Sequence, residues 1–135
     1  MSAEGRGKSL LLVEDDDLTR ELFTYVLEGR GYTVAGAPNG LEAFGLILDG
    51  YTPDCIVLDL RMPVMDGRQF RARQLDEPAL ADIPVLLLSG EHSLPREAAE
   101  LGAAGYLQKP VAPDDLLAAL RGCCGGRQAH RVGVQ

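Results

Sequence analysis

Short apolar runs alternate with helix-like segments along almost the whole chain, and this alternation limits the possible folds more than any other feature of the sequence. Each run has four to six residues, which is enough for a buried strand but too short for a typical helix. Strands are predicted at residues 9–13, 32–37, 55–58, 85–88 and 105–108. Helices are predicted at residues 18–31, with Gly31 as a stop, and at 39–50, 67–75, 95–102 and 113–121. Strands and helices that alternate in this way form a parallel sheet with helices on both faces, so we expect an α/β fold.

The first helical segment carries Gly29 and four apolar residues at helical spacing, which predicts the face that it buries. These positions are Leu18, Leu22, Tyr25, Val26 and Gly29. Asp16 or Asp17 can accept the first backbone N–H groups of this helix as its N-cap.

The length and charge of the chain restrict its size class and its partners. A length of 135 residues fits one domain with its own core. The formal net charge of −7 argues against nonspecific binding to nucleic acids and to anionic membranes. The first residues do not resemble a signal peptide, and no apolar run approaches the roughly 18 residues of a membrane span. We expect a cytoplasmic domain at residues 9–121, between flexible ends at 1–8 and 122–135, without membrane or direct nucleic-acid contact.

The three cysteines suggest a reducing compartment and no disulfide framework. Cys55 stands inside a strand-like run and is expected to be a small core residue. Cys123 and Cys124 stand among glycines near the end of the sequence, with His130 beyond them. These residues could form a Cys-Cys-His metal site or belong to an unstructured tail. The tail is favoured because only two types of metal-binding side chain occur together there.

Polar side chains follow four of the five predicted strands. Glu14 and Asp15 follow the first, Asp59 the third, Ser89 the fourth and Lys109 the fifth. Because the carboxyl ends of parallel strands share one edge of a sheet, these side chains are expected to converge although they are far apart in the sequence. Three carboxylates in one place repel each other and need a cation, and carboxylate oxygens suit Mg²⁺. A hydroxyl and an ammonium are partners for phosphate oxygens, and a carboxylate beside Mg²⁺ can attack a phosphoryl group. Asp59 is therefore interpreted as a phosphoryl acceptor.

Four sequence motifs in this order resemble the receiver domain of two-component response regulators, over roughly residues 8–121. They are "LLVEDD", "IVLDLRMPVMDG", "LLLSGE" and "GYLQKP". The resemblance implies a flavodoxin-like fold of five strand–helix units, with strand order 2-1-3-4-5. One departure is Gly90 after Ser89, where the family often has alanine, and this puts the rigidity of that loop in doubt.

The resemblance also implies a role for each site residue. Asp59 would be phosphorylated, and Mg²⁺ would be bound by Asp15 and Asp59 directly, by Glu14 through water, and by the backbone carbonyl of Arg61. Ser89 and Tyr106 would be the switch residues, and Lys109 would contact the phosphoryl group. The donor would be a sensor histidine kinase or a histidine phosphotransfer protein. An output protein would bind the face formed by the fourth helix, the fifth strand and the fifth helix.

Each site residue also has a simpler interpretation. Asp59 could cap the turn before Pro63, and the two acids after the first strand could favour the start of the next helix. Ser89 and Lys109 could be ordinary surface residues, and Tyr106 a core aromatic. Their joint occurrence at strand ends favours the site.

Other functions remain as alternatives. A phosphatase-like enzyme with an aspartyl-phosphate would need a second acid two residues after Asp59, where this chain has Arg61. An unphosphorylated scaffold would not need the complete set of site residues. The sequence fits a single-domain regulator or a piece of a hybrid kinase or DNA-binding regulator, and the starting Met1 favours the first.

Arg61 and Glu91 stand two residues after Asp59 and Ser89, at the ends of neighbouring strands. Family resemblance associates these two positions with the lifetime of the phosphorylated state. The two side chains have opposite charge and could pair across the mouth of the site, or could remain solvated without meeting.

Overall fold

The computed structural model describes residues 7–125, in which five strands and five α-helices alternate along the chain. The strands are β1 (Ser9–Val13), β2 (Thr33–Ala37), β3 (Cys55–Asp59), β4 (Val85–Ser89) and β5 (Gly105–Gln108). The helices are α1 (Asp17–Glu28), α2 (Gly40–Leu48), α3 (Gly67–Leu75), α4 (Leu94–Leu101) and α5 (Pro113–Leu120). A π-helical turn, η1 (Arg121–Gly125), continues α5. All ten predicted strands and helices are present, with ends that shift by only a few residues.

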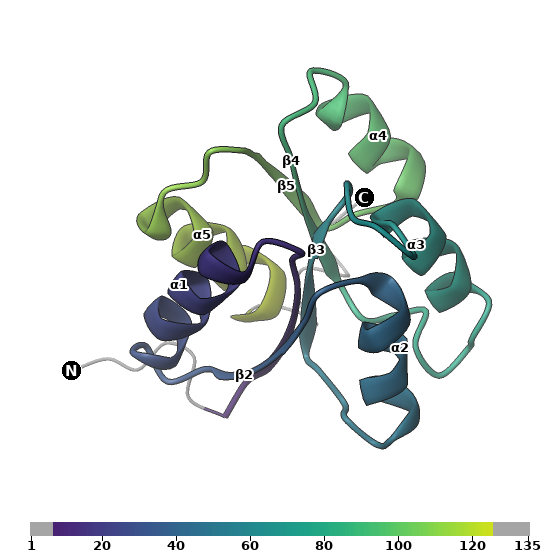
Figure 1. Ribbon diagram of the computed structural model, residues 1–135, viewed down its shortest axis with the longest axis horizontal. Coiled ribbons are helices and arrows are strands. Elements are labelled where there is room, and N and C mark those ends of the chain that lie inside the picture. The colour runs from purple at the N-terminus through teal and green to yellow at the C-terminus, as the bar shows by residue number, and fades with distance from the viewer. Residues whose placement is uncertain (1–6, 126–135) are drawn as a thin grey trace.

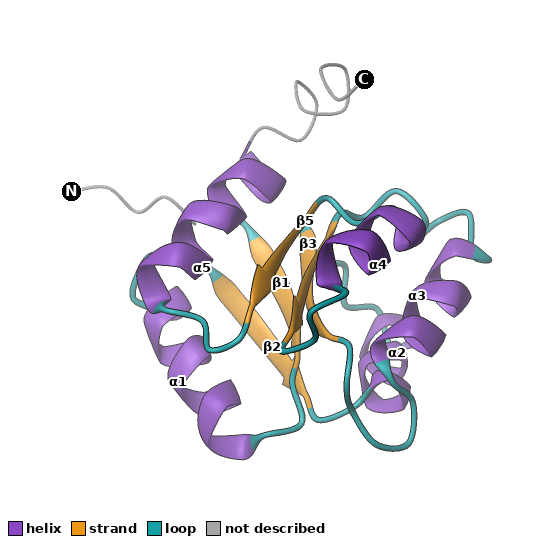
Figure 2. Ribbon diagram, turned by 90° about the horizontal axis from the view of Figure 1, so that it is seen from above, coloured by secondary structure: helices purple, strands orange, loops and turns teal. Residues whose placement is uncertain are grey.

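The sheet is parallel throughout and has the order β2-β1-β3-β4-β5, as the sequence led us to expect. Helices α1 and α5 lie on one face, and α2, α3 and α4 lie on the other (Figures 1 and 2). Within residues 7–125, every helix falls short of the length and apolar character that a membrane crossing needs.

Alternate side chains of the central strands enter two separate cores. Leu10 and Leu12 of β1 pack on the side of α1 and α5, whereas Leu11 and Val13 pack on the side of α2, α3 and α4. Because helices cover both faces, the central strands are buried along their whole length, and their sequences are continuously apolar. This explains why they are recognisable as strands in the sequence.

The buried face of α1 differs from the predicted one. Phe23 and Leu27 are its buried residues, whereas Leu18, Leu22 and Tyr25 are 75%, 52% and 79% exposed. The helix carries two apolar stripes, and helical spacing alone does not reveal which of them meets the sheet. Asp16 is the N-cap, since its side chain accepts a hydrogen bond from the Thr19 N–H at 2.8 Å.

The predicted flexible tail at residues 122–135 was wrong for its first part. Residues 121–125 form η1, and both Cys123 and Cys124 are buried in the core that α5 shares with the sheet. The glycine-rich sequence resembles a linker, but the small thiol side chains fill space against the sheet instead. The predicted ends at residues 1–6 and 126–135, together with His130, lie outside the described residues.

Two arginines of α3 hold α4 through polar contacts. Arg71 is buried, and its guanidinium donates to the carbonyl oxygens of Leu101 at 2.9 Å and Gly102 at 3.0 Å, where α4 ends. Burial lowers the pKa of Arg71, and the guanidinium supplies donors that these helix-terminal carbonyls need. At the other end of α4, Arg68 forms an ion pair with Glu97.

Candidate functional site

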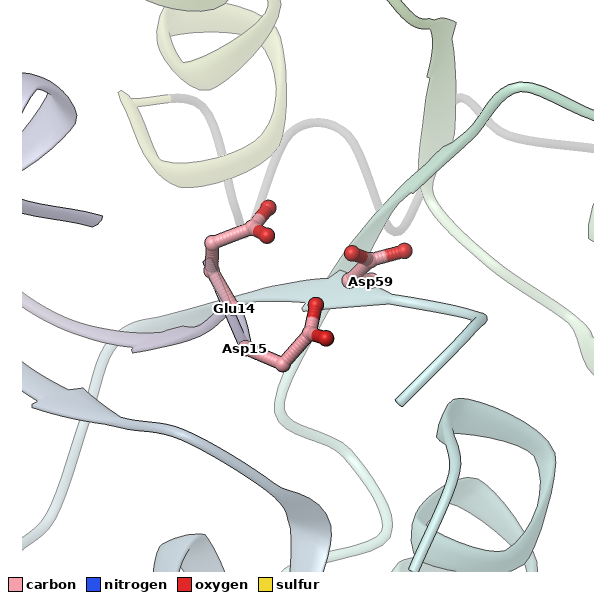
Figure 3. Close-up of side chains that lie close together, drawn as sticks. All are labelled: Glu14, Asp15 and Asp59. Atoms are coloured by element: carbon pink, nitrogen blue, oxygen red, sulfur yellow. The ribbon is translucent and has the colours of Figure 1, made fainter. Parts of the chain in front are cut away.

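The carboxyl edge of the sheet brings together the polar residues that follow the strands. The ladder between β1 and β3 pairs Val13 with Leu58, so that the residues after them leave the sheet at the same level. Figure 3 shows the carboxylates of Glu14, Asp15 and Asp59 around one small space. One carboxylate oxygen from each of the three residues lies within 4.8 Å of the other two. The predicted convergence of these three residues is confirmed.

Lys109 reaches the same space from the end of the edge strand β5. The backbone N–H of Lys109 donates to the carbonyl of Ser89 at 2.9 Å, which keeps the end of β5 against β4. Its ammonium Nζ donates to Asp59 Oδ2 at 2.7 Å and to Glu14 Oε1 at 3.0 Å. Burial alone would lower the pKa of Lys109, but the hydrogen bonds to Asp59 and Glu14 outweigh it and raise the pKa. The lysine therefore stays charged and offsets the negative charge of the site.

Glu14 is fully buried and is the most constrained of the three acids. One carboxylate oxygen accepts from Lys109, and the other accepts from the Asp16 N–H at 3.0 Å. Burial raises the pKa of Glu14 despite these hydrogen bonds. The Arg20 guanidinium donates to the Glu14 backbone carbonyl at 2.7 Å and fixes the chain at this point.

Asp15 and Asp59 differ in their exposure to solvent. Asp15 is exposed, whereas Asp59 is 2% exposed and its Oδ1 accepts from the Arg61 N–H at 3.1 Å. Three carboxylates at this spacing form a site that could hold a metal ion, and an all-oxygen donor set fits a hard divalent cation. The predicted part of the Arg61 carbonyl in metal binding stays a prediction.

Gly67 was predicted only as the start of a helix, which is confirmed, and the structure shows why this position must be glycine. Its N–H donates to the Leu60 carbonyl at 3.1 Å, and a Cβ atom there would lie 2.6 Å from the Asp59 backbone oxygen. Only glycine therefore allows α3 to start this close to Asp59. Asp66 caps the same helix in a capping box with Gln69, and the "Asp-Gly" pair in the sequence was the available signal.

Ser89 and Tyr106 lie on the neighbouring strands β4 and β5, and the register of the ladder places their side chains on the same face of the sheet. Ser89 is fully buried, and its Oγ accepts from the Glu91 N–H at 3.1 Å. Tyr106 is opposite Leu87 in the ladder and is 47% exposed, so it is not the core aromatic considered as an alternative.

Arg61 and Glu91 form the ion pair that the sequence left open. Arg61 Nε donates to Glu91 Oε2 at 2.7 Å, and both side chains remain partly exposed, at 70% and 37%. Together with Leu60 and Arg68 they line a small pocket next to the end of β3. The pair connects the loop after Asp59 to the loop after Ser89.

Comparisons with known proteins agree with this geometry. Residues 10–121 match the family described as the response regulator receiver domain. "Response regulator MprA" of Mycobacterium sp. (strain KMS) is 40% identical over 114 residues, which are 83% of this chain and 48% of that protein. The "Phosphate regulon transcriptional regulatory protein PhoB" of Pseudomonas aeruginosa is 34% identical over 117 residues, which are 85% of this chain and 51% of that protein. The chain thus spans about half the length of the curated relatives it matches.

Solved structures show the same fold. A putative response regulator from Chloroflexus aurantiacus has a TM-score of 0.81 and 33% identity, covering 87% of this chain and 98% of its own. Chemotaxis protein CheY4 of Vibrio cholerae has a TM-score of 0.79 and 30% identity, covering 86% of this chain and 98% of its own.

Repulsion within the acid cluster predicts that Asp15→Asn stabilises the metal-free protein. Asp15 lies beside two other carboxylates, and removing its charge leaves the Lys109 contacts with Asp59 and Glu14 intact. In chelator, thermal melts should show a rise on the order of 2 °C over the wild type. Added divalent metal should then stabilise the wild type more than the variant.

Glu100→Gln is the matched control, since it removes an exposed carboxylate of α4 outside the cluster. Glu100→Gln should leave the melting temperature at the wild-type value both in chelator and with added divalent metal. A lower melting temperature of Asp15→Asn in chelator would contradict the repulsion.

Proposed function

The chain belongs to the response regulator receiver domain family, a family of signalling domains, and on that premise we propose that Asp59 accepts a phosphoryl group from a phosphohistidine. The observation that carries the proposal is the contact of the Lys109 ammonium with Asp59 Oδ2 beside two further carboxylates. A buried aspartate between an ammonium and a possible metal site is arranged for phosphoryl transfer, in which both cations offset charge on the transferred oxygens.

The residues of this chain have separate tasks in the proposed transfer. An oxygen of Asp59 attacks phosphorus, the bond to the histidine nitrogen breaks, and Lys109 contacts a phosphoryl oxygen. We propose that Mg²⁺ is held by Asp15 and Asp59, by Glu14 through water and by the Arg61 carbonyl, and that it supplies positive charge to the phosphoryl oxygens. Glu14 orients Lys109, because its Oε1 accepts from the same ammonium.

We propose that the domain passes on a signal and does not turn over a separate substrate. Position 61 holds an arginine, and its side chain is paired with Glu91, so the second acid of a phosphatase-like enzyme has no counterpart there. Water would later hydrolyse the aspartyl-phosphate. Turnover of a small phosphate ester is therefore not expected.

Family membership implies a histidine kinase and an output partner, and two surfaces suit them. Beside Lys109, an apolar groove is lined by Leu22, Phe23, Pro110 and Val111. A histidine kinase or phosphotransfer protein could bind there, next to the exposed stripe of α1, and reach Asp59. For the output partner we propose the face of α4, β5 and α5, which carries the exposed Tyr106.

Asp59→Asn should abolish phosphorylation, because an amide nitrogen or oxygen is not a competent nucleophile here. Incubation with acetyl phosphate and Mg²⁺ should add one phosphoryl group to the wild type and none to the variant, as measured by intact mass. Asp66→Asn is the control: it lies in the same loop, and asparagine caps a helix as well as aspartate. A phosphoryl adduct on Asp59→Asn would refute the assignment.

We further propose that phosphorylation shifts a conformational equilibrium through Ser89 and Tyr106. A phosphoryl oxygen on Asp59 would attract the Ser89 hydroxyl away from the Glu91 N–H that it now accepts from. Tyr106, on the neighbouring strand, would then turn inward. A ligand can shift such an equilibrium only as far as its differential stabilisation allows.

Ser89→Ala should therefore keep phosphorylation but lose most of the conformational response. A hydrogen bond to a charged group is worth about 1.5–3 kcal/mol, so its loss should move the equilibrium back by about tenfold or more. The measurement is the NMR signal of the Tyr106 ring with and without beryllofluoride, a mimic of the phosphoryl group. Thr33→Ala, which removes an exposed hydroxyl of β2, is the control and should respond like wild type. An undiminished response in Ser89→Ala would count against the switch.

The Arg61–Glu91 pair is proposed to slow hydrolysis of the aspartyl-phosphate. Closed beside the site, it would hinder the in-line approach of water to phosphorus. An exposed pair is worth at most about 1 kcal/mol, so opening it should speed hydrolysis by no more than about fivefold.

Arg61→Ala and Glu91→Ala are each expected to shorten the lifetime of the phosphorylated state, and the double variant should be no faster than the faster single one. The measurement is the decay of the phosphorylated species after removal of acetyl phosphate. Arg96→Ala, an exposed arginine of α4, is the control. Independent, multiplying effects in the double variant would show that the two side chains form no shared barrier.

A further inference from the structure

Arg20 of α1 makes polar contacts to which the proposed phosphoryl transfer assigns no task. Its Nη1 donates to the backbone carbonyl of Glu14 at 2.7 Å, and its Nη2 forms an ion pair with Asp17 at 2.6 Å. The Arg20 side chain is only 21% exposed, whereas that of Asp17 is 82% exposed. An ion pair with so exposed an acid is worth little by itself, so it does not explain why the guanidinium is held at the carbonyl.

Gly36 of β2 leaves the space through which Arg20 reaches this carbonyl. A Cβ atom at residue 36 would lie 3.2 Å from Arg20 Cδ, which is closer than ordinary van der Waals contact. In the ladder, Gly36 is opposite Leu12, two residues before Glu14. Glycine weakens the interior of a strand and often marks a place where another group approaches the backbone closely. Here that group is the stem of Arg20, which lies directly over the β2 backbone.

The carbonyl that Arg20 contacts belongs to the peptide group between Glu14 and Asp15. Glu14 has further support, because its N–H donates to the Ala37 carbonyl at 3.0 Å and its carboxylate accepts from Asp16 and Lys109. Asp15 has no comparable support. Among residues 7–125, its carboxylate has no hydrogen-bond or ion-pair partner. The direction of the Asp15 side chain therefore depends on its backbone.

A fixed carbonyl at Glu14 also fixes the start of Asp15. The atoms of a peptide group lie in one plane, so the direction of the Glu14 carbonyl sets the direction in which the Asp15 Cα lies. A charged donor at 2.7 Å opposes rotation of this plane. The result is an Asp15 carboxylate held beside Asp59, with one oxygen of each within 4.8 Å of the other.

We propose that Arg20 is a positioning residue of the metal site, which fixes the peptide group between Glu14 and Asp15 and thereby aims the Asp15 carboxylate at the ion. The inference rests on the metal binding proposed above, but it concerns a residue outside the set of metal-binding groups. Its effect is one of geometry, since Asp17 offsets the charge of the guanidinium. Hydrogen-bond partners that orient metal-binding groups commonly change metal affinity by about 10- to 100-fold.

Titration of the full chain with Mg²⁺, followed by the NMR signals of the backbone amides, tests the proposal. Arg20→Met removes the guanidinium donors but keeps an unbranched stem over Gly36, and it should weaken Mg²⁺ binding by about tenfold. Arg96→Met is the matched control, because it removes an exposed arginine of α4 and should change the affinity by less than about twofold. Asp17→Asn removes the ion pair but leaves the carbonyl contact, and it should also stay within about twofold of the wild type.

Asp15→Ala distinguishes the positioning of one carboxylate from a general weakening of the site. In Asp15→Ala there is no carboxylate left for Arg20 to orient, so adding Arg20→Met should cost little further Mg²⁺ affinity. A purely structural or long-range electrostatic effect would multiply the two losses instead. A second readout needs no metal: in chelator, the Asp16 N–H, which donates to the Glu14 carboxylate, should exchange its hydrogen faster in Arg20→Met than in the wild type.

The possible failures of Arg20 and of the metal site can be told apart. Mg²⁺ affinity of Arg20→Met equal to that of the wild type would overturn the role of Arg20 and leave the function proposed for Asp59 intact. Losses that multiply in the double variant Asp15→Ala/Arg20→Met would overturn it equally. A wild type that binds Mg²⁺ no better than Asp15→Ala would overturn the proposed metal site, and the role of Arg20 with it.

Discussion

The contact of one ammonium with two buried carboxylates is the interaction on which the rest of the site depends. Glu14 and Asp59 are almost completely removed from water, and unpaired charges in such positions would be too costly to keep. Lys109 reaches both, and backbone N–H groups of Asp16 and Arg61 satisfy the other carboxylate oxygens. The site is thus held by groups from the ends of three strands. Breaking the lysine contact would leave two buried negative charges beside a third acid.

The parallel sheet makes this arrangement possible because the apolar residues that stabilise the fold lie along the strands, whereas the polar residues of the site lie at the strand ends. Alternating residues of each central strand fill two aliphatic cores, and the strands end together at one edge. The polar residues at these strand ends are not members of either apolar cluster. They are therefore free to form a charged cluster there, while the cores contribute the free energy that holds it in place.

Much of the fold and of the site could be predicted from the sequence because both depend on local pattern. Strands such as β3 and β4 are continuous apolar runs, and their ends are marked by Asp59 and Ser89. What could not be predicted depends on contacts between distant segments. Which apolar stripe of α1 faces the sheet is decided by α1 packing against its neighbours. The burial of Cys123 likewise depends on the space that Gly105 leaves for its sulfur atom. Residue 67 must be glycine because a Cβ atom there would collide with the Asp59 carbonyl oxygen.

The way in which α4 is attached suggests how a change at Asp59 could reach a distant surface. Leu94 and Ala98 of this helix are buried, and Leu101 packs against the same core from a partly buried position. The arginines of α3 add polar contacts, at Glu97 near the start of the helix and at the Leu101 and Gly102 carbonyls at its end. Glu97 Oε1 is buried without a hydrogen-bond partner among the described residues, which leaves this attachment incompletely satisfied. Polar contacts can be exchanged for others at small net cost, whereas apolar burial cannot. If Asp59 is phosphorylated as proposed and the loop between Ser89 and α4 is drawn towards the phosphoryl group, these polar contacts would be the ones to change.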